Sequence, residues 1–328
     1  MSVLGRSTGL SHPGRKRRRN EDAWVCHPPL FAVADGMGGA RGGEIASRVA
    51  ATALGESVDG SGESRVVALI QEANRQVYER AREDSDASGM GTTITLALFE
   101  DGIVSIGHVG DSRAYLIRDQ KVEQLTEDHS LVAELVRTGR LSPEEAETHP
   151  QRSVITRALG TDPDVDVDAF SIEAKPGDLF LICSDGLSSM VDDETILEVV
   201  ERQRADIDAV AKELVAAANR RGGEDNITVV FFEVIEEGAE APSETKPMPA
   251  LDDEPAEKAD EDTLTEADRV PAVDTMVVPP EHARRVAAEI EPQEPKQRLS
   301  VQAARVVVGI AVVAGLALLV YWLLGQSQ

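Results

Sequence analysis

The sequence predicts an α+β fold in which antiparallel sheets carry helices on their outer faces. Two apolar runs, residues 92–99 and 103–109, are separated only by Glu100-Asp101-Gly102, which is the pattern of a β-hairpin. The amphipathic helical stretches are grouped apart from such hairpins, which favours antiparallel sheets over repeated parallel crossovers. The expected strands are residues 31–34, 92–99, 103–109, 114–118, 179–183 and 226–234. The expected helices are residues 44–57, 64–85, 129–138, 193–201 and 207–221.

Composition narrows the class of protein. The 328 residues include 33 basic and 59 acidic side chains, for a net charge of -26. Such a chain repels nucleic acid, so we expect no nucleic-acid partner. Aromatic residues make up only 3%, so the core is expected to consist mainly of Val, Leu, Ile and Ala. Cys26 and Cys183 stand beside apolar residues, without a Cys-x-x-Cys pair or a secretory signal, which favours buried thiols in a reducing compartment.

The strand and helix pattern ends near residue 235, which we take as the end of a folded domain spanning residues 1–235. Residues 236–268 contain thirteen acidic and two basic side chains, and nine of the sixteen prolines lie between positions 242 and 295. A segment of this composition cannot bury enough apolar surface to offset the entropy cost of ordering. We therefore expect residues 236–300 to be an acidic, proline-rich disordered linker.

The C-terminal region predicts a membrane anchor. Residues 306–324 are nineteen positions without a charge, which as a helix at ~1.5 Å per residue span ~28 Å, about one bilayer core. Tyr321 and Trp322 stand near one end, where interfacial aromatic residues are common. Basic residues occur at positions 296–305, before the segment, and none follows it. By the positive-inside rule we expect a single-pass helix over residues 304–324, with the preceding chain on the cytoplasmic side of the cytoplasmic membrane.

Aspartates adjoin four of the expected strands. Asp35, Asp111 and Asp185 each follow a strand, and Asp225 precedes one. Each alone is explicable as a turn, which is the more common explanation of a single Asp-Gly at a strand end. Four carboxylates gathered at one edge of the sheets would repel one another unless cations lay between them. Ligation by oxygen alone suits Mg²⁺ or Mn²⁺ better than Zn²⁺, which would call for His or Cys.

A second polar group comes earlier in the chain, where Arg17 is followed by Glu21 and Asp22. In isolation these residues have the composition of a solvated salt-bridge surface. Beside a metal cluster, the guanidinium fork of an arginine matches two phosphate oxygens, and the acids can hold metal-bound water. Together the two groups indicate two-metal hydrolysis of a phosphate ester, with a bridging hydroxide attacking in line.

Six short motifs in this order and spacing carry a resemblance to a known family. They are Arg17-x-x-Asn20-Glu21-Asp22, Ala34-Asp35-Gly36-Met37-Gly38-Gly39, Gly89-Met90-Gly91-Thr92-Thr93, Val109-Gly110-Asp111-Ser112-Arg113, Ser184-Asp185-Gly186-Leu187 and Asp225-Asn226-Ile227-Thr228. Over residues 5–235 the chain resembles the bacterial metal-dependent serine/threonine protein phosphatases of type 2C, the PPM class. The resemblance implies a four-layer αββα sandwich, in which two antiparallel sheets are flanked by helices, and a catalytic domain at residues 1–235.

The resemblance also implies a set of metal ligands. Asp35 would bridge two Mn²⁺ or Mg²⁺ ions, and the carbonyl of Gly36 would complete the coordination of one of them. Asp185 and Asp225 would bind the other ion. Asp111, together with Asp185, is similar to the ligand set of a weaker third metal ion in this family.

The remaining site residues follow from the same resemblance. Arg17 would hold the substrate phosphate, and Glu21 and Asp22 would orient metal-bound waters. Some members of the family carry a histidine just after the metal-binding glycine, or after the Gly-Gly pair. This chain has Met37 and Ala40 at those positions, so no leaving-group acid is assigned.

The resemblance implies that the protein is a serine/threonine phosphatase, which reverses the phosphorylation carried out by cytoplasmic Ser/Thr kinases. A flap is implied at residues 129–157, with His149 and Arg152 beside the active site. The expected partners are phosphorylated proteins, among them a Ser/Thr kinase and its substrates, and the catalytic domain is expected to be monomeric. Two alternatives stay open: a phosphatase of small regulators in a partner-switching pathway, and a non-catalytic scaffold that binds phosphoproteins.

Overall fold

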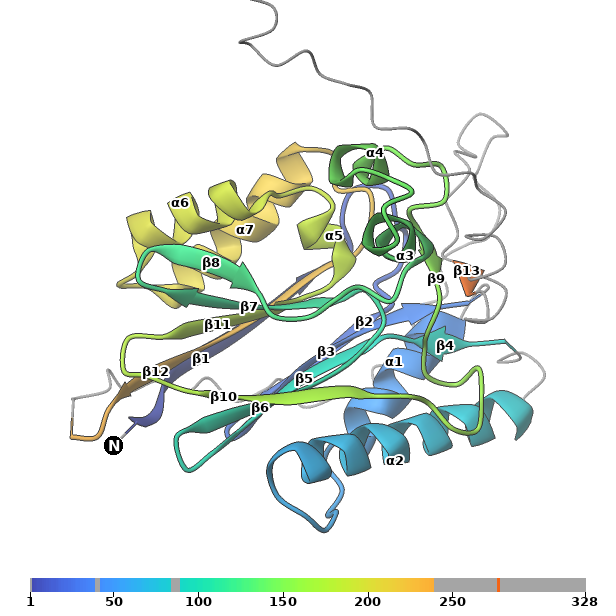
Figure 1. Cartoon of the computed structure of the whole chain (residues 1–328), viewed down its shortest axis with the longest axis horizontal. Coiled ribbons are helices and arrows are strands. Elements are labelled where there is room, and N and C mark those ends of the chain that lie inside the picture. Colours follow the sequence, from blue (N-terminus) through green and yellow to red (C-terminus); the bar gives the residue numbers. More distant parts are fainter. Residues whose placement is uncertain (1, 39–41, 84–88, 239–275, 278–328) are drawn as a thin grey trace, which may run out of the picture. The chain divides into compact units, whose positions relative to one another are not determined.

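Two antiparallel sheets form the centre of the computed structural model, which describes residues 2–38, 42–83, 89–238 and 276–277 (Figure 1). In the first sheet the order is β1 (Ser2–His12), β12 (Ile227–Glu236), β11 (Leu179–Cys183), β7 (Arg113–Arg118) and β8 (Lys121–Gln124). In the second sheet the order is β10 (Asp168–Glu173), β6 (Ile103–Val109), β5 (Ile94–Glu100), β3 (Leu30–Met37) and β2 (Asp22–His27), with β4 (Gly91–Thr92) paired to the end of β3.

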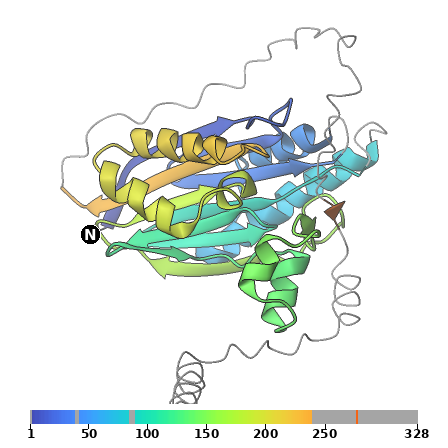
Figure 2. The ribbon, with the colours of Figure 1, turned by 90° about the horizontal axis from the view of Figure 1, so that it is seen from above.

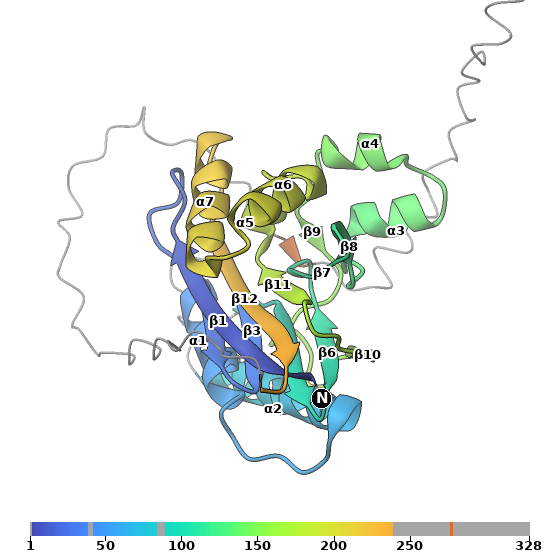
Figure 3. The ribbon, with the colours of Figure 1, turned by 90° about the vertical axis from the view of Figure 1, so that its left-hand side faces the viewer.

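The sheets face one another across an apolar layer and carry helices on their outer faces. Between them, the ring of Phe232 stacks on Phe31 and on Phe180, at centroid distances of 4.2 and 4.8 Å. Helices α6 (Asp193–Gln203) and α7 (Ile207–Arg220) cover the first sheet (Figure 2). Helices α1 (Gly42–Ala53) and α2 (Gly62–Glu83) cover the second, on the opposite side of the molecule (Figure 3). The predicted antiparallel α+β architecture is confirmed.

Apolar residues at helical spacing, together with local caps, explain these helices. Helix α6 buries Ile196, Val199 and Val200 on one face, and Asp192 caps it by accepting a hydrogen bond from the backbone N–H of Thr195. Helix α7 repeats the arrangement, with Asp206 as its cap and seven buried residues on one face: Ile207, Val210, Ala211, Leu214, Val215, Ala217 and Ala218. Burial of these faces against the sheet supplies most of the stability of such short helices.

The strongest apolar runs give the best agreement between expected and observed elements. Strands β6 and β11 have the predicted bounds, because each is a nearly continuous buried run. Strand β1 was not predicted: its residues are almost all half-buried and mix apolar, small and polar types without alternation, so only its pairing with β12 makes it a strand. The placement of Asp35 after the end of its strand was wrong. It lies within β3, because Gly36 and Met37 continue the strand by pairing with β4.

The predicted linker, residues 236–300, lies outside the described residues except at 236–238 and at β13 (Met276–Val277). At Met276–Val277 the structure contains a strand that the linker prediction did not include. It pairs with β9 (Val154–Ile155), in the predicted flap. The predicted membrane helix, residues 304–324, also lies outside the described residues. Among the residues that are described, no helix is both long and apolar enough to span a bilayer.

Candidate metal centre and substrate groove

Strand β3 carries Asp35 into the site, and two threonines hold its backbone in place. The Asp35 N–H donates to the hydroxyl of Thr93 at 3.1 Å, and the Asp35 carbonyl accepts from the Thr93 N–H at 2.9 Å. The hydroxyl of Thr92 donates to the same carbonyl at 2.8 Å. These bonds use the main chain of Asp35 and leave its carboxylate to interact with the other acids of the site.

Gly36 lies where three segments meet too closely for any side chain. A Cβ atom at this position would lie 2.1 Å from the carbonyl oxygen of Gly43 in α1 and 2.5 Å from that of Glu21. The Gly36 N–H donates to the Glu21 carbonyl at 3.1 Å. Only glycine can therefore bring β3, the start of α1 and the Glu21 segment together beside Asp35.

The carboxylate of Asp22 ties both sheets to the site. Its Oδ2 accepts hydrogen bonds from the hydroxyl of Ser184, at 2.9 Å, and from that of Thr228. Ser184 also immediately precedes α5 (Asp185–Ser188), so Asp185 opens a one-turn helix. The Oδ1 atoms of Asp22 and Asp185 are both buried without a hydrogen-bond partner in the described structure. Buried carboxylate oxygens of this kind require a cation, a proton or water.

Asp225 accepts a hydrogen bond from the guanidinium of Arg17 at 2.7 Å, in an ion pair that is about three-quarters buried. Asn226, the next residue in the chain, holds the backbone on both sides of Arg17. Its Oδ1 accepts from the Glu21 N–H at 2.8 Å, and its Nδ2 donates to the carbonyls of Pro13 and Arg19 at 3.0 and 2.9 Å. The structure thus brings Arg17 to the carboxylates, as the sequence predicted.

Burial and mutual repulsion raise the pKa values of several carboxyls in this group. Burial, followed by the neighbouring carboxylates, raises the pKa of Asp35 and that of Asp185 well above the usual range. Burial likewise raises the pKa of Asp22 to about 6 and that of Asp111 to about 7. Burial alone would lower the pKa of Arg17, but Asp225 and the other nearby carboxylates outweigh it. The site therefore carries more negative charge than its surroundings can accommodate.

We expect the carboxyls of the site to make the metal-free protein less stable as the pH rises. Carboxyls whose pKa is raised in the folded state bind protons that the unfolded chain has already released, so they lower the free energy of unfolding from about pH 4 to about pH 7. A shift of two units in one group corresponds to about 2.7 kcal/mol. His108 and His129, whose pKa values burial lowers, act in the opposite direction, so the test compares two proteins. In urea unfolding with EDTA at a series of pH values, Asp185→Asn should lose less stability, or gain more, than the unchanged chain as the pH rises; the same pH dependence in both would contradict the assignment.

Asp111 follows β6, and His129 holds the loop in which it lies. The Gly110 N–H donates to His129 Nδ1 at 3.0 Å, and the His129 N–H donates to the Gly110 carbonyl at 2.7 Å. Because Nδ1 accepts and burial lowers the pKa of His129, the neutral ring carries its proton on Nε2, which lies 3.1 Å from Asp168 Oδ2. Arg157 pairs with the same carboxylate. The segment that begins the flap is thereby joined to the Asp111 loop.

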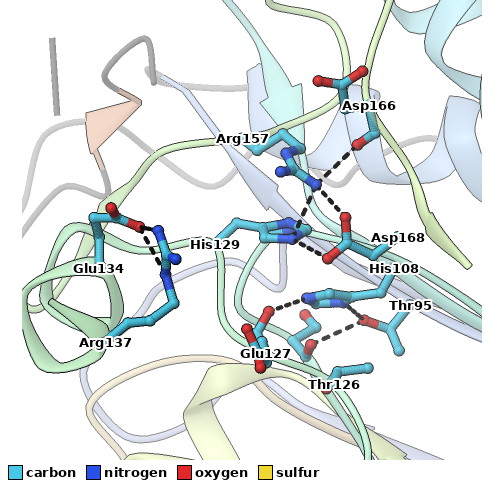
Figure 4. A network of polar contacts seen from close by, with 12 residues as sticks. Thr95, His108, Thr126, Glu127, His129, Glu134, Arg137, Arg157, Asp166 and Asp168 are labelled. Atoms are coloured by element: carbon cyan, nitrogen blue, oxygen red, sulfur yellow. Dashed lines mark hydrogen bonds and ion pairs between the residues drawn. The ribbon is translucent and has the colours of Figure 1, made fainter. Parts of the chain in front are cut away.

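A second imidazole lies beneath His129 in the same network (Figure 4). His108 is fully buried between the hydroxyl of Thr95, at 2.9 Å from Nδ1, and the carbonyl of Glu127, at 3.0 Å from Nε2. Burial lowers the pKa of His108 to about 3, so the ring is neutral. Both nitrogens have partners, which identifies His108 as a structural residue of the core.

The predicted flap contains α3 (Leu131–Arg137), α4 (Pro143–Glu147) and β9. A groove of about 1520 Å³ separates it from α5 and α6, and both Asp111 and Asp185 line this groove. Arg152 lies on the flap side, 3.3 Å from Glu224, which also pairs with Lys16. Of the two predicted flap residues, the structure places Arg152 in the groove. His149 instead accepts a hydrogen bond from the Gln151 N–H within its own loop.

The residues present fit hard divalent cations by their chemistry. No group of three His, Cys, Asp or Glu side chains is already arranged to hold a metal ion within the described ranges. The negative charges of Asp22 and Asp185 nevertheless act on Asp35 and help to raise its pKa, and two carboxylate oxygens there lack partners in the described structure. Oxygen donors with unmet charge, open to water on one side, are the type of site that Mg²⁺ or Mn²⁺ prefers. Met37 is buried, and Ala40 lies outside the described residues.

Sequence reasoning missed the residues that position the acids. Thr93, Ser184 and Asn226 belong to motifs that were recognised, but they received no role. The signal in the sequence is that each is a hydrogen-bonding residue beside an apolar strand. In the structure all three are buried, with 1%, 0% and 3% exposure. Buried polar side chains must find partners, and here the partners are the main chain and carboxylates of the site.

Comparisons with known proteins agree with this geometry. The model of the family described as protein phosphatase 2C matches residues 8–221. The serine/threonine phosphatase Stp of Listeria monocytogenes is 40% identical over 233 residues, which cover 67% of this chain and 92% of that protein. The serine/threonine protein phosphatase PstP of Mycobacterium tuberculosis is 40% identical over 240 residues, which cover 72% of this chain but only 46% of PstP, so the match spans about half of that relative.

Solved structures are similar as well. A crystal structure of PstP from M. tuberculosis has a TM-score of 0.68 and 39% identity, covering 71% of this chain and all of that one. The catalytic domain of PstP in complex with two manganese ions has a TM-score of 0.66 and 38% identity, covering 72% of this chain and all of the other.

Proposed function

Because this chain belongs to the protein phosphatase 2C family, we propose that it hydrolyses phosphoserine and phosphothreonine in proteins. The observation that carries the proposal is the ion pair of Arg17 with Asp225, close to the buried carboxyls of Asp35 and Asp185 and beside a groove. A phosphate ester needs both parts, since its own negative charge must be held and neutralised before water can attack it.

The proposed metal ligands are Asp35, the Gly36 carbonyl, Asp185 and Asp225 for two Mn²⁺ or Mg²⁺ ions, and Asp111 with Asp185 for a weaker third. The two manganese ions in the PstP catalytic domain support the proposal, as do the unpartnered oxygens of this chain. When bound, such ions would activate water and neutralise charge on the phosphate.

The other residues of the site would bind the substrate and orient water. Arg17 would pair with the phosphate through its guanidinium fork, exchanging its present contact with Asp225. Asp22, whose Oδ1 is unpartnered, and Glu21, whose carboxylate approaches Gly43 beside Gly36, would accept hydrogen bonds from water in the site. Arg152 on the flap would contact the peptide that carries the phosphate, and His149 would support the flap loop.

A direct test uses the purified full chain and a phosphothreonine peptide, with and without Mn²⁺. We expect phosphate release that requires Mn²⁺ and is removed by EDTA, with little release from the matching phosphotyrosine peptide. Manganese binding is measured separately by titration calorimetry. A protein that binds Mn²⁺ but releases no phosphate from either phosphoserine or phosphothreonine peptides would refute the enzymatic function and favour the scaffold alternative.

We propose further that residues 304–324 anchor the catalytic domain at the cytoplasmic membrane, close to a Ser/Thr kinase that it opposes. The uncharged sequence of this segment supports the anchor. Deleting residues 300–328 should move the protein from the membrane fraction to the soluble fraction and slow dephosphorylation of a membrane kinase. Unchanged dephosphorylation after this deletion would argue against the tether.

A further inference from the structure

One part of the predicted linker differs from the rest in composition. Residues 269–280 contain a single acidic residue, Asp274, and a single basic one, Arg269, whereas the segment 236–268 carries a net charge of -11. Within this run, residues 272–278 include three valines and a methionine and lie between Pro271 and the proline pair at 279–280. Apolar, β-branched residues between prolines have the composition of a short edge strand.

The structure places Met276–Val277 of this run, strand β13, in parallel pairing with β9 of the flap (Figure 1). Met276 is opposite Val154, and Val277 is opposite Ile155. Ile155 also forms an antiparallel bridge with Ser130. A strand has one neighbour on each edge, so β13 lies on the edge of β9 opposite to Ser130. Ser130 lines the groove, so β13 pairs with the edge of β9 that faces away from the groove.

Strand β9 connects the flap to the metal-site strand through its two side chains. Val154 packs against the apolar cluster of the flap that contains Leu131 and Leu135. Ile155, which is 2% exposed, packs with Met37, and Met37 directly follows Asp35 and Gly36 in β3. The residues on either side of β9, Ser153 and Thr156, line the groove. Whatever holds β9 in place therefore holds the flap wall of the groove.

We propose that the linker strand β13 is a docking element in cis, which pairs with the free edge of β9 and braces the flap against β3. Its effect on substrates rests on the proposed phosphatase function, but the docking itself does not. The occupant is the chain's own residues 276–277, because this is the segment paired there and it lies in a nearly uncharged stretch of an acidic linker. Tethering gives the strand an effective concentration of about a millimolar, so a short pairing suffices.

Backbone geometry identifies the atom that reports on docking. The Thr156 N–H donates to the His129 carbonyl at 2.8 Å, on the Ser130 edge. Successive N–H groups of a strand point to opposite edges, so the Ile155 N–H faces β13. Loss of β13 should expose the Ile155 amide to solvent and leave the Thr156 amide protected.

The experiment compares the full chain with a variant carrying Met276→Pro and Val277→Pro, since proline cannot donate to a strand pair. The matched control carries Ala250→Pro and Leu251→Pro, an uncharged pair elsewhere in the predicted linker. We expect hydrogen exchange of the Ile155 amide to accelerate about tenfold or more in the β13 variant only. Exchange at Thr156 should stay unchanged. Unchanged exchange at Ile155 would overturn the docking.

Kinetics test the bracing. In the β13 variant we expect KM for a phosphothreonine peptide to rise about three- to tenfold, because the flap wall is less ordered. Hydrolysis of p-nitrophenyl phosphate, which does not extend along the groove, should change less than twofold. A fall in KM for the peptide would overturn bracing, because it would mean that the linker competes with substrate. Accelerated exchange in a chain without phosphatase activity would support docking and refute only the proposed function.

Discussion

Asp185→Asn is expected to abolish Mn²⁺-dependent turnover and, at the same time, to stabilise the metal-free protein. The carboxylate repels its neighbours, and its buried Oδ1 has no partner in the described structure. Asparagine has the same shape without the charge, so it relieves the repulsion but cannot balance a cation. We expect kcat to fall at least about a thousandfold, which corresponds to about 4 kcal/mol. The metal-free free energy of unfolding should rise by about 1 kcal/mol or more.

Calorimetric Mn²⁺ titration and urea unfolding in EDTA measure the two effects. The matched control is Asp178→Asn, which removes another buried carboxylate, one that is 1% exposed and paired with Arg118 at 2.6 Å. Because this control breaks an ion pair, it should lower stability and leave Mn²⁺ binding intact. Retained turnover in Asp185→Asn, or lower metal-free stability than in the unchanged chain, would contradict the role assigned to this carboxylate.

Arg17→Ala is expected to reduce kcat/KM for phosphothreonine peptides about a hundredfold while tightening the binding of Mn²⁺. The first effect follows from losing a charge-assisted hydrogen bond to phosphate, worth about 1.5–3 kcal/mol. The second follows from the present contact: the guanidinium lies 2.7 Å from Asp225 and neutralises a carboxylate that would otherwise attract the cation. A purely structural role for Arg17 would not give opposite signs for substrate and metal.

Two further variants complete this test. Arg17→Lys keeps the positive charge but loses the planar fork, so its kcat/KM should fall between those of the unchanged chain and Arg17→Ala. Arg18→Ala removes the exposed neighbouring charge and should change kcat/KM less than twofold. If Arg17→Ala weakened Mn²⁺ binding as strongly as it reduced turnover, Arg17 would be supporting the metal site and not the phosphate.

Long apolar runs made much of the fold predictable. Strands β6 and β11 are continuous apolar runs, and helices α6 and α7 each have one apolar face. Such patterns are buried whatever their neighbours are, so the sequence alone predicted these four elements well. Strand β1 depends on one partner, β12, and its own residues do not separate into an apolar and a polar set. The one-turn helix α5 receives no capping bond from the side chain of Ser184, whose hydroxyl instead bonds Asp22, so its four residues do not by themselves specify a helix.

The sequence by itself determined which chemical groups this protein can bring to a site, because aspartates beside strands, glycines beside them and an early arginine are local features of six motifs. The tertiary structure alone decided how those groups are partnered. Asp22 meets Ser184 and Thr228 across 162 and 206 positions of the chain, and Arg17 meets Asp225 across 208. Contacts over such separations depend on the packing of the two sheets. That packing leaves two carboxylate oxygens without partners at the candidate metal centre and brings a strand of the linker to the flap.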